Sequence, residues 1–158
     1  MDKVSLTVPS NPLVGTWSML DWYNVDTDGQ KHYPLGRDAT GYISYSSDGF
    51  VFVHLMAADR QLYVENDPFG GAATEDSMAM KSQITYAGPY AYTKDQVTHH
   101  VTHASCPNWV GTDQIRDITF DGDRLILSAG DATFQGKSVT AYVIWERAVQ
   151  PASPDKPI

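Results

Sequence analysis

The stretch LVGTWSMLDWYN, residues 13–24, decides the fold of this chain. Gly15 permits a close backbone approach, and Trp17 begins a run whose side chains alternate between two faces, as in a β-strand. Strict alternation places Trp17, Met19, Asp21 and Tyr23 on one face. An indole so early in a small β-protein is large enough, at roughly 200 Å² of buried surface, to plug one end of a barrel.

The partner that this indole needs lies at the other end of the chain. A strand predicted over residues 139–147 ends in Arg147, whose guanidinium can stack on the indole while its charge stays near water. The first and last strands are then neighbours, and the sheet closes. Alternating apolar runs between turn signals predict further strands at 40–45, 50–56, 90–93, 96–104, 113–120 and 124–128. We therefore expect an all-β fold, an antiparallel barrel of about eight or nine strands with one short helix and an internal cavity.

The strand predicted at residues 50–56 is apolar on both faces. Such a strand is either covered by another element or buried in a dimer contact, so a homodimer is one expectation. The covering element can be the single predicted helix, which begins after Thr74 as N-cap and has Glu75 and Asp76 in its first turn. Residues 59–73 precede that helix, and their length and their glycine and proline content predict a mobile flap over a cavity.

Length, charge and cysteine content limit the class of protein. The 158 residues suit one domain, expected at 11–149, between a flexible arm at 1–10 and a disordered tail at 150–158. A net charge of −8 disfavours nucleic acid and anionic membranes as partners. The lone Cys106, with no leader or long apolar run in the sequence, predicts a cytoplasmic location.

Several segments of the chain resemble the small microbial lipocalin-like family. They are Gly15-Thr16-Trp17, residues 33–42, 47–49, 99–101, 107–112 and 120–125, and Trp145-Glu146-Arg147-Ala148. The resemblance extends from about Asn11 to Ala148 and implies a β-barrel with an internal cavity. By analogy with lipocalin-like barrels of natural-product pathways, it also implies a cofactor-free cyclase or isomerase of secondary metabolism.

Ionisable side chains on apolar strands are the candidate catalytic residues. Arg116 shares a face with Ile118 and Phe120, so an inward-facing guanidinium can polarise a carbonyl. His54 or His99 can move a proton, because a neutral imidazole is a natural acid or base near pH 7. Asp21, or a carboxylate or enolate of the ligand, can pair with Arg116. Alternatively, Arg116 lies at the barrel mouth and pairs with a surface acid.

Aromatic and polar side chains supply the candidate ligand-binding residues: Trp17, Asp21, Tyr23, Tyr45, Phe52, Tyr92, His103, Trp109 and Tyr142. A cavity lined in this way suits a small apolar or aromatic molecule. We expect no metal and no cofactor, since His99 and His103 lie about 13 Å apart on a strand of roughly 3.3 Å per residue. A haem held by His54 or His99 stays open as a minor alternative.

Two functions from different classes fit this pattern. One is a cofactor-independent cyclase, isomerase or dehydratase acting on a polyketide- or terpenoid-like intermediate, and the other is a non-catalytic carrier of a hydrophobic ligand. No nucleophile elbow, phosphate-binding glycine loop or pair of catalytic carboxylates is present in the sequence. Convergence of the polar groups on one point of the cavity would favour the enzyme.

Overall fold

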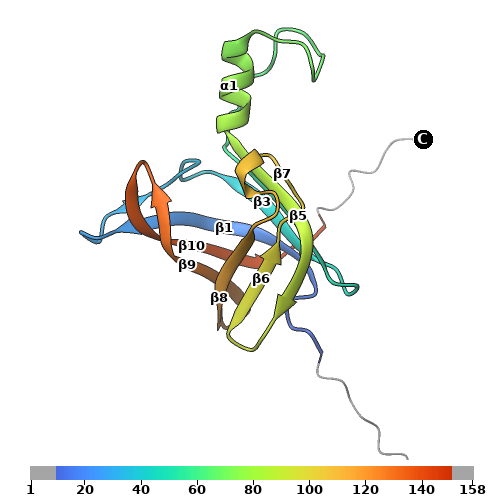
Figure 1. Ribbon diagram of the computed structural model, residues 1–158, viewed down its shortest axis with the longest axis vertical. Coiled ribbons are helices and arrows are strands. Elements are labelled where there is room, and N and C mark those ends of the chain that lie inside the picture. Colours follow the sequence, from blue (N-terminus) through green and yellow to red (C-terminus); the bar gives the residue numbers. More distant parts are fainter. Residues whose placement is uncertain (1–9, 151–158) are drawn as a thin grey trace, which may run out of the picture.

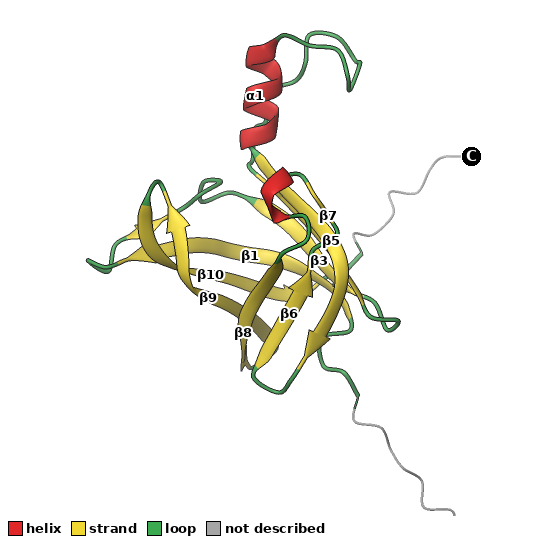
Figure 2. Cartoon of the chain, viewed as in Figure 1, coloured by secondary structure: helices red, strands yellow, loops and turns green. Residues whose placement is uncertain are grey.

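A computed structural model describes residues 10–150, and their strands form one closed antiparallel barrel (Figures 1 and 2). The strands are β1 (Gly15–Asp26), β2 (Lys31–His32), β3 (Thr40–Tyr45), β4 (Phe50–Met56), β5 (Gln83–Tyr92), β6 (Gln96–His100), β7 (His103–Ala104), β8 (Asp113–Asp121), β9 (Arg124–Phe134) and β10 (Lys137–Arg147). The helices are α1 (Ala73–Lys81) and the one-turn 3₁₀ helix η1 (Pro107–Trp109). Except for Ser10 and Gln150, the expected arm and tail lie outside the described residues.

The barrel closes because β1 pairs with both β3 and β10. Its order around the wall is β1, β3, β4, β5, β6, β8, β9 and β10, while the short β2 adds to β1 and the short β7 adds to β5. The predicted all-β barrel with a helix and an internal cavity is thus confirmed. The first and last strands are neighbours, as the pairing of Trp17 with Arg147 required.

Trp17 plugs one end of the barrel and is only 2% exposed. Its indole Nε1 donates to the Leu13 carbonyl at 2.9 Å, and the Arg147 guanidinium lies 3.8 Å above the ring centroid. The same guanidinium donates to the carbonyls of Val14 at 2.6 Å and Pro12 at 2.9 Å. A Cβ on Gly15 would stand 2.7 Å from Arg147 Nη1, so only glycine leaves room for this contact.

A β-bulge at Leu20 changes the inward face of β1. Met19 pairs with Trp145 and Asp21 with Ile144, so Leu20 has no partner and the alternation shifts by one residue. Beyond the bulge, Trp22 and Asn24 face the interior. The predicted inward positions of Asp21 and Tyr23 are therefore wrong, since both side chains face outward.

Strand β4 turns its aliphatic face inward and its aromatic face outward. Val51, Val53 and Leu55 belong to the core, whereas Phe52 is 55% exposed. The expectation that the helix covers this outer face is wrong, because α1 projects from one end of the barrel and none of its side chains is buried (Figure 1).

Helix α1 also begins earlier than the sequence predicts. The N-cap is Ala72, whose N–H donates to the Glu75 carboxylate at 3.0 Å, so Thr74 lies inside the helix. No helix within residues 10–150 is long and apolar enough to cross a membrane.

The Arg147→Lys substitution tests the barrel closure. Lysine keeps the charge but loses the planar fork that reaches two carbonyls and covers the indole. We expect the free energy of unfolding, measured by urea denaturation, to fall by about 1–3 kcal/mol. Arg124→Lys at an exposed site is the matched control, with an expected change within about 0.5 kcal/mol. An equal, small effect of the two substitutions would contradict this account of the closure.

Candidate functional site

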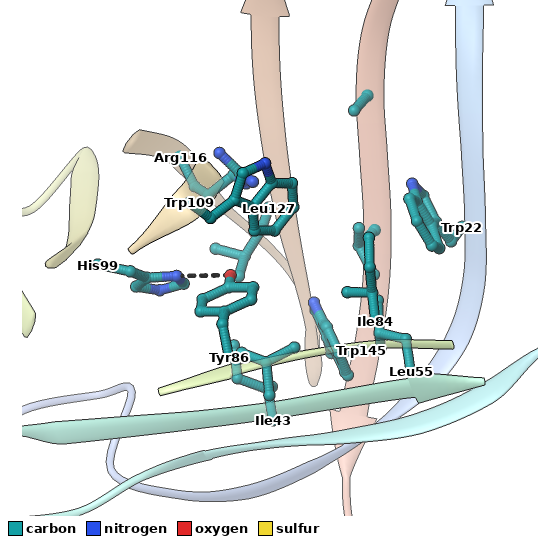
Figure 3. A pocket seen from close by; sticks show the side chains of 13 residues that line it. Trp22, Ile43, Leu55, Ile84, Tyr86, His99, Trp109, Arg116, Leu127 and Trp145 are labelled. Atoms are coloured by element: carbon teal, nitrogen blue, oxygen red, sulfur yellow. Dashed lines mark hydrogen bonds between the residues drawn. The ribbon is translucent and has the colours of Figure 1, made fainter. Parts of the chain in front are cut away.

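The interior of the barrel contains a partly open cavity of about 80 Å³ (Figure 3). Every barrel strand and η1 contribute to its wall, which is formed by Trp22, Ile43, Val53, Leu55, Ile84, Tyr86, His99, Trp109, Arg116, Leu127, Ala141, Val143 and Trp145. This volume is about half that of an apolar cavity of roughly 150 Å³, which holds benzene. The cavity is thus mostly apolar and small, with a few polar groups in its wall.

His99 is the buried polar centre of the barrel and is 1% exposed. Its Nε2 lies 2.8 Å from the Tyr45 hydroxyl, and its Nδ1 lies 2.8 Å from the Tyr86 hydroxyl. Three strands hold these rings, since Tyr45 comes from β3, Tyr86 from β5 and His99 from β6. Figure 3 shows the bond between His99 and Tyr86 at the cavity wall.

Burial keeps all three of these groups neutral. It lowers the pKa of His99 to about 3, with a further contribution from the positive charge of Arg116. Burial also raises the pKa values of the Tyr45 and Tyr86 hydroxyls. Near pH 7 the trio is therefore an imidazole between two phenols, with one ring N–H and two O–H groups.

The burial of Tyr45 decides which ring nitrogen of His99 carries the hydrogen. Tyr45 is 1% exposed, and His99 is the only hydrogen-bond partner of its hydroxyl among the described residues. If Tyr45 accepted from Nε2, its own O–H would be buried without an acceptor, at a cost of about 1–3 kcal/mol. Tyr86 is buried as well, but it lines the cavity, where a ligand can accept its O–H. We therefore infer that Tyr45 donates to Nε2 and that Nδ1–H donates to Tyr86. The Tyr86 O–H is then free to donate into the cavity.

Arg116 extends from β8 into the wall of the cavity. Its Nη1 donates to the Ile115 carbonyl at 2.9 Å and its Nη2 to Gln114 Oε1 at 3.2 Å. Both acceptors are uncharged, and no carboxylate in residues 10–150 lies within salt-bridge distance of this guanidinium. Neither Asp21 nor a surface acid supplies the expected partner, so the cavity wall carries an uncompensated positive charge.

Two tryptophans complete the polar side of the site. Trp145 is 2% exposed, and its Nε1 has no hydrogen-bond partner in the described part of the chain. Figure 3 shows the nitrogen edge of this indole turned into the pocket. Trp109, on η1, packs edge-on against Tyr86 with ring centroids 5.5 Å apart. It is half-buried and lines the cavity, and its short helix η1 lies at the end of the barrel where α1 projects (Figure 1).

Three of the predicted site residues meet at this cavity, namely His99, Trp109 and Arg116. Tyr45 is linked to the cavity only through its hydrogen bond to His99, and Trp17 fills the closed end of the barrel beneath Arg147. The sequence analysis missed Trp22, Tyr86 and Trp145. Tyr86 lies between Ile84 and Gly88 on the inward face of β5, a strand whose first half was not predicted.

Other predicted site residues lie away from the cavity. Tyr23 and Tyr142 stack on the outer surface with centroids 5.4 Å apart, on the same face as Asp21. His54 and Phe52 are exposed on the outer face of β4, because Val51, Val53 and Leu55 take the inner positions. The two remaining residues, Tyr92 and His103, are exposed at the end of β5 and on β7.

The cavity does not fit the minor haem alternative. Both ring nitrogens of His99 are engaged by tyrosines, His54 lies outside the barrel, and about 80 Å³ is far too small for a porphyrin. No group of three or more metal-ligating side chains comes together within residues 10–150.

Fold and cavity together define a small β-barrel of the ligand-binding kind. Residues 14–148 match the lipocalin-like domain family, and the chain belongs to that family. Among solved structures, a mutant of the fluorescent protein UnaG is similar over 85% of this chain and 95% of its own, with 15% identity and a TM-score of 0.36. A comparison with curated proteins finds no match. The chemistry of the ligand is therefore inferred from the cavity.

The depressed pKa of His99 predicts a loss of stability in acid. In the unfolded chain His99 takes up a proton near pH 6.5, but in the barrel only near pH 3. Between these values the unfolded state binds more protons, so the free energy of unfolding falls as pH falls, by at most roughly 1.4 kcal/mol per pH unit. Urea denaturation between about pH 4 and 7 measures this slope.

The matched variants are His99→Gln, which should flatten the slope, and His103→Gln at an exposed site, which should leave it unchanged. An unchanged slope in His99→Gln would show that the buried imidazole does not govern the acid sensitivity.

Proposed function

We propose that this protein binds a small, largely apolar molecule inside the barrel. The observation that carries the proposal is the cavity inside the barrel, which has a mostly apolar wall with a few polar groups, the usual composition of a small-molecule site. Membership of the lipocalin-like family supports the same class of function.

The size of the cavity limits how the ligand enters. About 80 Å³ accommodates only a short group, so a larger ligand requires the wall to move or leaves part of itself outside. Trp109 is the wall residue best placed to move, because it stands on a single 3₁₀ turn and not on a barrel strand. We propose that this indole swings aside when the ligand enters.

A cofactor-independent isomerase or cyclase is the second candidate function. The observation in its favour is that Tyr86 and Arg116 line one cavity, where their N–H and O–H groups can stabilise an enolate oxygen. A proton carrier is harder to assign, because both nitrogens of His99 are hydrogen-bonded and its pKa is about 3. The geometry thus favours binding over catalysis, and turnover of a natural-product intermediate stays a secondary proposal.

The cellular location and the oligomeric state are also proposals. A cytoplasmic location rests on the single Cys106. A homodimer rests on the exposed outer face of β4, where Phe50, Phe52 and Met56 are 44%, 55% and 39% exposed.

Filling the cavity tests the binding proposal. Toluene and cyclohexanone serve as probes, with binding followed by shifts of amide NMR signals. Wild-type protein should show saturable shifts at cavity residues, and Val143→Phe should weaken them at least tenfold because the added ring occupies the cavity. Ile144→Phe, the next residue of β10 on the outer face, is the matched control.

Val143→Ala provides a second, independent arm, because a larger cavity should strengthen binding of the same probes. Shifts confined to the outer surface, or equal binding by all variants, would overturn the proposal. The same samples in D₂O report on catalysis. Faster exchange of the α-hydrogens of cyclohexanone in wild-type protein than in Arg116→Gln would favour the isomerase.

A further inference from the structure

The polar groups left free at the cavity wall are all hydrogen-bond donors. They are the Tyr86 O–H, the Trp145 Nε1–H and the remaining N–H groups of Arg116. We infer that the end of the ligand buried in the barrel is a carboxylate, held by these three side chains. This inference rests on the proposed binding function and specifies the chemical class of the ligand.

Charge is the first argument for a carboxylate. Arg116 is the only lysine or arginine in the cavity wall, and its two hydrogen-bond acceptors are neutral. The half-buried guanidinium has no counter-ion among the described residues, and one negative charge on the ligand would supply it. Because the wall offers a single positive charge, a monoanion fits better than a phosphate dianion. A neutral carbonyl would leave the charge unbalanced.

Hydrogen-bonding capacity is the second argument. An ionised carboxylate only accepts hydrogen bonds and can take about four, whereas an alcohol or amide also brings donors. In the inferred tautomer no side chain of the cavity wall offers a free acceptor to such donors, because both ring nitrogens of His99 are engaged by tyrosines. The orphan N–H of Trp145, 2% exposed, gains a partner when a carboxylate enters.

The arrangement assigns Tyr45 and His99 a positioning role. Tyr45 fixes the tautomer of His99, and that tautomer turns the Tyr86 hydroxyl into a donor toward the ligand. Neither residue needs to touch the ligand. The buried hydrogen bond that Tyr45 on β3 makes to His99 therefore determines whether the hydroxyl of Tyr86 on β5 can donate into the cavity.

A matched pair of probes tests the ligand class. Butanoate and butanamide have the same number of heavy atoms and differ in charge and in donors. At about pH 7, titration calorimetry or NMR should give a dissociation constant at least tenfold lower for butanoate, because hydrogen bonds to a charged acceptor are stronger than those to a neutral one. In Arg116→Gln this preference should fall below threefold. Arg124→Gln, at an exposed site, should keep it.

The Tyr86→Phe substitution is a second test of the ligand class. It removes one donor and keeps the ring, so butanoate affinity should fall about five- to tenfold while Arg116 preserves a preference for the anion. Equal binding of butanoate and butanamide by wild-type protein, with toluene still entering the barrel, would overturn the carboxylate inference and leave the proposed function intact. Failure of toluene, butanoate and butanamide alike to shift cavity signals would overturn the proposed function itself.

Discussion

The pairing of the first strand with the last is the constraint on which the rest of this structure depends. It aligns Trp17 with Arg147, and the guanidinium then ties the chain before β1 to the end of β10 through the carbonyls of Pro12 and Val14. The closed wall has no open edge strand and encloses its own core. With one end filled by Trp17, the remaining interior space lies toward the other end, under Trp109.

Burying a polar side chain inside the closed barrel costs free energy because the side chain loses its contact with water. His99 is such a side chain. The cost is offset because each ring nitrogen is hydrogen-bonded to a tyrosine hydroxyl of the barrel wall, one nitrogen as donor and the other as acceptor. Arg116 and Trp145 differ, because they retain N–H groups that no described residue accepts. The buried Asn24 Oδ1 also lacks a partner among the described residues, but Asn24 does not line the cavity. Because Arg116 and Trp145 do line it, we interpret their unused donors as available to a ligand.

The sequence was sufficient for the fold and for part of the site. Alternation and turn signals placed most of the strands, and Trp17 with Arg147 predicted the closure. The bulge at Leu20 carries no sequence signature, so the expected inward face of β1 failed after Met19. On β4 both faces are apolar, so alternation alone could not choose between Val53 and His54. Hydrogen-bond partners such as Tyr45 and Tyr86 for His99 depend on the three-dimensional meeting of strands that are distant in sequence.

The inferred tautomer of His99 frees the Tyr86 O–H to donate into the cavity. Long-range ¹⁵N NMR of the histidine ring at neutral pH distinguishes a protonated nitrogen from a bare one. We expect a hydrogen on Nδ1 of His99 and none on Nε2. Because the pKa of His99 is about 3, we also expect no imidazolium down to about pH 4. A hydrogen on Nε2, or an imidazolium near pH 6, would contradict this expectation.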